Sequence, residues 1–348
     1  MRKIRKRKEK QKKKILIISI FTFLLIMTSG YAAFSTNITL TAKGNIKCNP
    51  EIAKEKLIKE LTTSGDGLYE DSFEENRYIY KGENPNNYIK FNGELWRIVS
   101  LESDGTIKIY KEGALGQNFD EAGYRDNSSN GAGGTYCNQM TSGCNVWAAT
   151  NKLVGNPLEF SSGMFKGTVL LDSTLNEYLN NEYYNSLNSD KNYIVMHNFN
   201  IGQIVWYDET MFLDDVIEKW NNTASEYIWN GKIGLLSPVD ILKANIENTT
   251  CSISSPEGST IYASDEYNRH LNSYIKSENR RNMYLISPKG AQVGANMSTV
   301  SLAGEINDAT TYHPYTAAFS AAISFYLDSN IKLCGSGEET NPYTIYNQ

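Results

Sequence analysis

Hydrophobic and polar residues alternate most regularly between residues 87 and 113, in NYIKFNGELWRIVSLESDGTIKIYKEG. Two dipeptides, Asn92-Gly93 and Asp104-Gly105, interrupt the alternation, and both are typical of the tight turns of β-hairpins. The pattern therefore predicts three antiparallel strands, with inward-facing apolar positions at Trp96, Ile98, Ile107 and Ile109.

Apolar residues recur at helical spacing in several short stretches. Asn49-Pro50 favours a helix start and Gly65 a helix end, which predicts a helix between them that packs on the following domain. DSTLNEYLNNEYYNSL (172–187) predicts an amphipathic helix that begins with a capping box of Thr174 and Glu177. Shorter helices are expected in LDDVIEKW (213–220) and, after the capping residue Ser237, in PVDILKAN (238–245).

The remaining apolar segments favour strands. They are residues 35–47, 201–207, the pair 226–229 and 232–237 joined as a hairpin by Asn230-Gly231, and finally 282–288, 297–304 and 317–327. No repeat or low-complexity linker divides residues 67–348. The sequence therefore predicts one large α+β domain there, with an antiparallel sheet and a few short helices.

The N-terminus has a different pattern. Residues 1–14 form a basic leader, and residues 15–34 form an apolar run without a charge. Such a run is long enough to cross a bilayer, and the preceding positive charge places the leader in the cytoplasm. Two interpretations stay open: a retained transmembrane anchor, or a signal peptide that is cleaved near Ala32. Both predict export, with residues 35–66 as an extracellular stalk strand and helix.

Charge narrows the expected partners. The chain holds 34 basic and 39 acidic residues, and the leader contributes ten basic residues and one acidic residue. The rest therefore carries 24 and 38, a net charge of −14. A domain this acidic repels phosphate backbones, which argues against nucleic acid as a partner.

Several segments resemble an exported protein family of Gram-positive bacteria that is built on domain of unknown function 6273. The matching pieces are YIKFNGELWRIVSLESDGTIKI, TLNEYLNNEYYNSL, KIGLLSPVDILKAN, NMYLISP and FSAAISFYLDSNIKLCGSGEETNPYTI. They follow the family's order and cover most of residues 76–348. The resemblance implies an exported bacterial surface protein, and it implies an architecture more than an activity.

At a greater distance, the order of elements resembles the C-type-lectin-like fold of formylglycine-generating enzymes and variable bacterial receptor domains. LLSPVD (235–240) stands where that fold has an L-P-T-x-x-E-W segment. FSAAISFYL (319–327) stands in the place of its closing strand, without the usual arginine.

Five cysteines are present, and an exported domain favours disulfides. Cys137 and Cys144 are expected to form a local bridge across the Gly- and Asn-rich stretch 113–165. Cys251–Cys334 is the next expected pair, with Cys48–Cys334 as its rival.

Catalytic and metal sites are weakly indicated. The cysteine spacing and the scattered histidines do not fit zinc, and DNSSNG (126–131) lacks the glutamate of a calcium loop. No nucleophile elbow is present, Ser237 fits a helix cap, and Asp214, Asp215 and Glu218 fit a solvated helix face. The sequence therefore predicts neither an enzyme nor a bound metal or cofactor.

Aromatic residues favour binding. The chain has 23 tyrosines and five tryptophans, side chains that combine rigid contact area with a polar tip. The stretch 133–150 places Tyr136, Asn145 and Trp147 beside the expected Cys137–Cys144 bridge, and these three are the predicted ligand-binding residues. We expect a membrane-tethered, non-enzymatic surface protein that binds a glycan or a protein. The alternative is a pilin-like or matrix-fibre subunit.

Overall fold

The computed structural model describes residues 48–119, 147–150, 170–201, 210–224, 228–246, 250–253, 261–263, 273–277, 282–288, 297–300, 306–308 and 319–346, together with Lys14 and Ser19. Met1–Lys47 and Cys48–Gln348 form two separate compact units. The predicted leader, apolar segment and stalk strand lie outside the described residues, apart from Lys14 and Ser19. Among the helices that are described, none has the length and apolar character needed to cross a membrane.

The three predicted strands of residues 87–113 are confirmed. They are β4 (Tyr88–Phe91), β5 (Glu94–Leu101) and β6 (Ile107–Ala114), each antiparallel to the next. Asn92, Gly93 and Gly105 have left-handed backbones, with φ of 53°, 80° and 87°, as tight hairpin turns require. The four predicted inward residues are at most 1 % exposed.

The centre of the sheet is β19 (Ser320–Leu327), in which all eight residues are buried. It pairs antiparallel with β6 over its whole length, from Ser320 opposite Ala114 to Leu327 opposite Ile107. Its other edge meets β9 (Ile194–Val195), β13 (Ile233–Leu235) and, in parallel, β16 (Met283–Pro288). Phe325 packs against the ring of Trp96, with centroids 4.7 Å apart, so the hairpins and the closing strand share one core.

Two groups of strands extend the sheet outward from this centre. Beyond β5 and β4 lie β3 (Tyr78–Lys81), β2 (Gly67–Glu70), β21 (Tyr343–Ile345), β20 (Lys332–Cys334) and β1 (Glu51–Ile52). Beyond β16 lie β17 (Met297–Val300), β18 (Ile306–Asp308), β15 (Ile261–Ala263), β14 (Thr250–Ile253) and β11 (Thr210–Phe212). Two small separate sheets pair β7 (Ala148–Thr150) with β8 (Leu170–Asp172), and β10 (His197–Asn200) with β12 (Ile228–Gly231).

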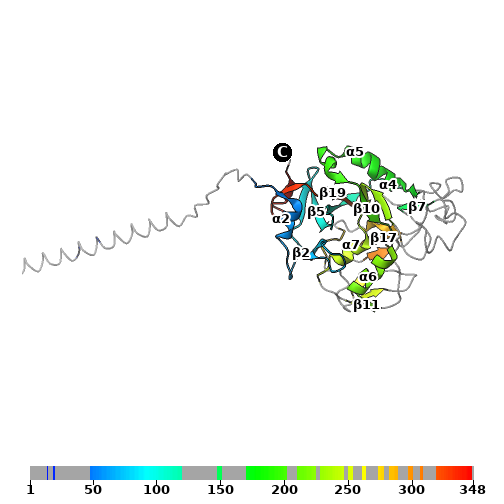
Figure 1. Ribbon diagram of the computed structural model, residues 1–348, viewed down its shortest axis with the longest axis horizontal. Coiled ribbons are helices and arrows are strands. Elements are labelled where there is room, and N and C mark those ends of the chain that lie inside the picture. Colours follow the sequence, from blue (N-terminus) through cyan, green and yellow to red (C-terminus); the bar gives the residue numbers. More distant parts are fainter. Residues whose placement is uncertain are drawn as a thin grey trace, which may run out of the picture. The chain divides into compact units, whose positions relative to one another are not determined.

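Short helices accompany the sheet, as predicted. They are α2 (Ala53–Ile58), α4 (Thr174–Tyr178), a π-helical turn η3 (Leu179–Tyr183), α5 (Tyr184–Ser186), a 3₁₀ turn η4 (Ser189–Tyr193), α6 (Leu213–Ala224) and α7 (Pro238–Lys243). In Figure 1, α4 and α5 lie at one end of this unit and α6 at the opposite end. The described residues therefore form an α+β, sheet-rich unit whose strand pairings are mostly antiparallel.

The segment 48–66, predicted as part of the stalk, packs within the same unit as the residues that follow it. Glu51–Ile52 forms β1 on the edge of β20, and the helix begins only at Ala53 instead of next to Asn49-Pro50. The prediction that this helix packs on the domain is confirmed, because Ala53 and Leu57 are completely buried.

Two local predictions are also corrected. The helix of residues 172–187 is capped by Ser173, whose hydroxyl accepts the Asn176 N–H, and not by Thr174. Asn230-Gly231 does not form a hairpin, because β12 pairs with β10 while β13 pairs with β19 in the main sheet. The Trp229 ring lies so close to Gly231 that any side chain at position 231 would collide with it. The chain passes from one sheet to the other at this point.

The disulfide prediction is half right. Cys334 is bonded, but to Cys48, so the rival pairing is the one present and Cys251–Cys334 is wrong. The reason lies in strand pairing: β20 ends at Cys334 and runs beside β1, three residues after Cys48. Cys251 belongs to β14, whose partners are β11 and β15. Cys137 and Cys144 lie outside the described residues.

Candidate functional site

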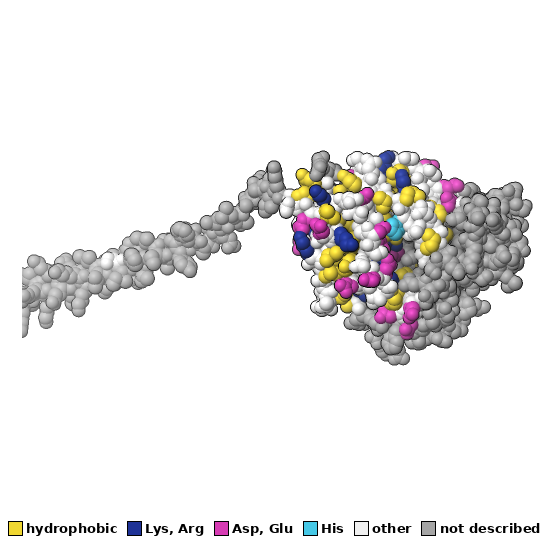
Figure 2. All heavy atoms as spheres, in the orientation of Figure 1, with side chains coloured by type: hydrophobic (Ala, Val, Ile, Leu, Met, Phe, Trp, Pro, Cys, Tyr) yellow, Lys and Arg dark blue, Asp and Glu magenta, His cyan; other side chains and the backbone are white. Residues whose placement is uncertain are grey.

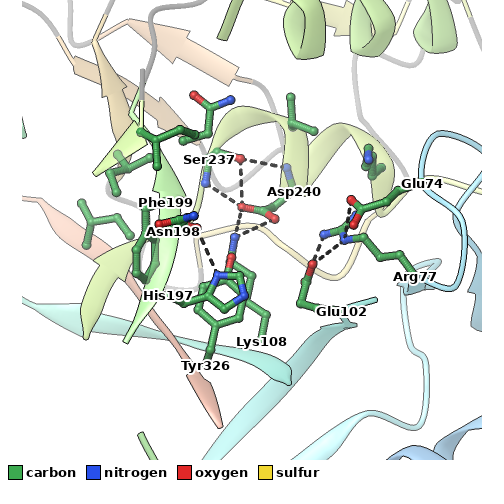
Figure 3. A pocket seen from close by; sticks show the side chains of 16 residues that line it. Glu74, Arg77, Glu102, Lys108, His197, Asn198, Phe199, Ser237, Asp240 and Tyr326 are labelled. Carbon is green, nitrogen blue, oxygen red and sulfur yellow. Dashed lines mark hydrogen bonds and ion pairs between the residues drawn. The ribbon is translucent and has the colours of Figure 1, made fainter. Parts of the chain in front are cut away.

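A cavity of about 260 Å³ lies where the small β10–β12 sheet and the start of α7 face the main sheet (Figure 3). Its wall combines charged, amide, aromatic and aliphatic side chains. They come from Glu74, Arg77, Glu102, Lys108, His197, Asn198, Phe199, Asn200, Ile228, Leu235, Ser237, Val239, Asp240, Lys243, Ile286 and Tyr326.

A polar row across three adjacent strands runs under the cavity, and two of its members, Lys108 and Tyr326, line it. In the ladder of the main sheet, Ser100 on β5 lies opposite Lys108 on β6, and Lys108 lies opposite Tyr326 on β19. Residues that are directly opposite point to the same face of a sheet. Helix α7 and strand β10 cover this face of the sheet. Lys108 is therefore only 5 % exposed, although it points away from the face that holds Ile107 and Ile109.

Arg77 is the first anchor of the buried charges. Its Nε lies 2.7 Å from Glu102 Oε2, and its Nη1 lies 2.5 Å from Asp71 Oδ2. Ser100 donates its hydroxyl to Glu102 as well. Glu74 is more distant, at 3.8 Å from Arg77 Nε, and its side chain is 49 % exposed at the cavity mouth.

The second anchor joins the sheet to α7. Lys108 Nζ donates to both oxygens of Asp240, at 2.9 and 2.7 Å. Asp240 Oδ2 also accepts the backbone N–H and the hydroxyl of Ser237, which forms a capping box at the predicted Ser237 cap. Lys243 Nζ, one turn later, reaches Asp71 Oδ2 at 2.8 Å and so links both anchors.

Burial opposes ionisation of these carboxyl groups, but their cationic neighbours outweigh it. Desolvation alone would raise the pKa of Glu102, and the charge and hydrogen bonds of Arg77 hold that pKa below its ordinary value. The same balance lowers the pKa of Asp71 beside Arg77 and Lys243, and that of Asp240 beside Lys108. Burial also raises the pKa of Tyr326 well above its ordinary value, which keeps its hydroxyl neutral.

These three buried cations and three buried carboxylates have a cost. Removing an ion from water costs several kcal/mol, and well-packed apolar residues often give equal or greater stability. Stability alone therefore does not account for so many charges around one cavity, and the cluster marks the cavity as the candidate site.

The mouth of the cavity is aromatic and polar. The His197 ring stacks on Tyr326, with centroids 3.7 Å apart and planes 15° apart. Its Nε2 lies 3.5 Å from Asp104 Oδ2, and its Nδ1 lies 3.2 Å from the carbonyl oxygen of Asn198. Figure 2 shows acidic side chains, in magenta, on one face of this unit.

A second cavity, of about 340 Å³, lies near the C-terminal strands and is bordered by Tyr193, Ile331 and Tyr346. Its charged lining residues, Asp328 and Lys332, are only half-buried. Without a buried charge cluster, it is the weaker candidate.

Of the predicted ligand-binding residues, Tyr136 and Asn145 lie outside the described residues. Trp147 is described: it is completely buried and packs edge-on against Trp229, with ring centroids 5.4 Å apart. Trp229 in turn contacts Phe199, which contacts Tyr326, so a continuous aromatic chain connects Trp147 to the cavity.

Little in the sequence indicates the cavity itself. Alternation around Ile107 and Ile109 places Lys108 on the solvent side, because nothing local indicates that both faces of the strand are covered. Its partner Asp240 lies 132 residues further along the chain, in a segment predicted only as a short helix after the Ser237 cap. Among the described residues no group of three or more His, Cys, Asp or Glu side chains fits a metal ion.

Comparisons of the chain with protein-family models, with curated proteins and with solved structures find no match.

Proposed function

We propose that the chain is a membrane-tethered, non-enzymatic protein of the bacterial cell surface whose exported domain holds part of a glycan or protein ligand in the cavity. The observation that carries this proposal is the cavity wall, in which paired charges stand beside the His197–Tyr326 stack. Groups that are fixed before the ligand arrives lose little freedom on binding, so their hydrogen bonds contribute more to affinity.

The size of the cavity limits the part of the ligand that enters. Sites for drug-sized ligands usually measure roughly 300–1,000 Å³, and this cavity is slightly smaller at about 260 Å³. We therefore propose that one sugar ring or one amino-acid side chain enters, while the rest of a larger ligand stays outside.

The protonation states favour binding over catalysis. A general acid or base works best when its pKa lies near the working pH. The pKa values of Glu102 and Asp240 are instead lowered by their cationic partners, and Ser237 uses its hydroxyl in the helix cap. These groups suit a fixed wall better than proton transfer.

Export is supported by two features. The basic leader and apolar segment 15–34 have the pattern of an anchor or signal, and Cys48–Cys334 is a bond typical of oxidising compartments. The order β13, Ser237 cap, α7 and closing strand β19 agrees with the resemblance to the domain of unknown function 6273 family and with a C-type-lectin-like arrangement. Membership in that family and that finer fold remain part of the proposal.

A binding screen tests the proposal. The full chain, purified in detergent, is applied to a glycan array and to cell-wall and host-protein extracts, with detergent micelles alone as the blank. We expect saturable binding to at least one class of ligand. Silence on the array and in both extracts would count against a binding domain.

A further inference from the structure

The charges around the cavity are not balanced at its mouth. The lining has three cations, Arg77, Lys108 and Lys243, and three carboxylates, Glu74, Glu102 and Asp240. Two further carboxylates, Asp71 and Asp104, contact lining residues. His197 apart, five carboxylates therefore face three cations, an excess of two carboxylates.

Each of the three cations is already paired with a carboxylate. Lys108 contacts both oxygens of Asp240, Lys243 contacts Asp71, and Arg77 lies between Asp71 and Glu102. A carboxylate, sulfate or phosphate would compete with these partners, and displacing one of them would leave a buried carboxylate unpaired, which costs several kcal/mol.

The surplus carboxylates are the accessible ones. The side chains of Glu74 and Asp104 are 49 % and 56 % exposed, whereas those of Glu102 and Asp240 are at most 10 % exposed. Both belong to one rim: Ser103 donates its hydroxyl to Glu74 at 3.0 Å, and the next residue, Asp104, lies beside His197. The His197–Tyr326 stack borders the same opening.

We infer that this cavity selects a ligand that carries a protonated primary amine on a polar body. The inference rests on the proposed binding function and names its ligand class. The ammonium group lies between Glu74 and Asp104 at the rim, and the polar body packs against His197. Two sources share this chemistry: a de-N-acetylated amino sugar of a surface glycan, and a lysine side chain.

Four probes separate the sources and test the charge. Titrations of the full chain in detergent use a glucosamine oligomer, its N-acetylated counterpart, a lysine-containing peptide and the same peptide with acetyl-lysine. Acetylation removes the positive charge and keeps the rest of the probe. We expect one amine probe to bind about tenfold more tightly than its acetylated partner, and higher salt to reduce that ratio.

The matched variants are Glu74→Gln at the rim and Glu339→Gln, an exposed position that does not line the cavity. Glu74→Gln should weaken binding of the amine probe up to about fivefold, as for a half-exposed charge pair, and leave the acetylated probe unchanged. Glu339→Gln should change neither value. Equal thermal midpoints for the two variants show that both fold.

Equal binding of amine and acetylated probes, or an unaltered amine affinity in Glu74→Gln, would overturn the inference. So would the failure of all four probes. In each case, the binding screen separates the two proposals. Capture of a ligand on the array or from the extracts would still support the binding function, whereas no capture would contradict the binding function too.

Discussion

Asp240 shows how one residue serves both the fold and the site. It accepts the Ser237 backbone and hydroxyl to cap α7, and it accepts both contacts from Lys108 on the neighbouring sheet. Because Lys108 is 5 % exposed, loss of the Asp240 charge leaves a buried ammonium group without its counterion.

The variant Asp240→Asn should therefore lower the free energy of unfolding by about 3–5 kcal/mol, the usual cost of breaking a buried ion pair on one side. Urea denaturation measures it. The double variant Asp240→Asn/Lys108→Met should recover much of the loss, since no unpaired charge remains. A cost below about 1 kcal/mol for the single variant would mean that water solvates Lys108.

At the scale of elements, the hairpins were predictable and the site was not. Asn92-Gly93 and Asp104-Gly105 encode their turns within two residues, through backbone angles that glycine adopts readily. Asn230-Gly231 has the same local signal, but the pairing of β13 with β19, far along the chain, prevents a hairpin there. The cavity depends on such distant pairings throughout, so its residues could not be brought together from sequence spacing.

The two confirmed turns allow a graded prediction. Gly93→Ala should cost about 1 kcal/mol, because φ is +80° and the added carbon meets no atom within 4 Å. Gly105→Ala should cost more, because its added carbon would also lie 3.2 Å from the Ser329 side chain. Thermal unfolding of both variants gives the order, and equal or reversed costs would contradict it.

For the whole molecule, Cys48–Cys334 ties the start of the Cys48–Gln348 unit to β20, the strand next to its C-terminal strand β21, across 286 residues. A bridge over so long a segment restricts the unfolded chain strongly and stabilises by roughly 2–5 kcal/mol. Cys48→Ser should lower the unfolding free energy by that amount. The double variant Cys48→Ser/Cys334→Ser should match the single one, and a single variant as stable as the wild type would show that the bond is not formed.

The unfolding free energy of the whole unit should also fall at low pH. The folded pKa values of Asp71, Glu102 and Asp240 lie below their ordinary values of 3.8, 4.5 and 3.8. Their stabilising contribution is thus complete above those ordinary values and is lost as the pH falls through the lowered folded values. Unfolding free energies at pH 7, 5 and 3 should be similar at the first two and clearly smaller at pH 3. The slope should be shallower in the Asp240→Asn/Lys108→Met variant, and an unchanged slope would contradict the assignment.

The central claim is that ligand binds at the cavity, and the His197→Ala variant tests it most directly. His197 borders the mouth and stacks on Tyr326, whereas the adjacent Met196 is 54 % exposed and does not line the cavity. With a ligand from the screen, His197→Ala should raise the dissociation constant about fivefold or more, as for loss of one aromatic contact of about 1 kcal/mol, and Met196→Ala should leave it unchanged. Equal affinities for wild type and His197→Ala would contradict the claim and place the binding surface elsewhere.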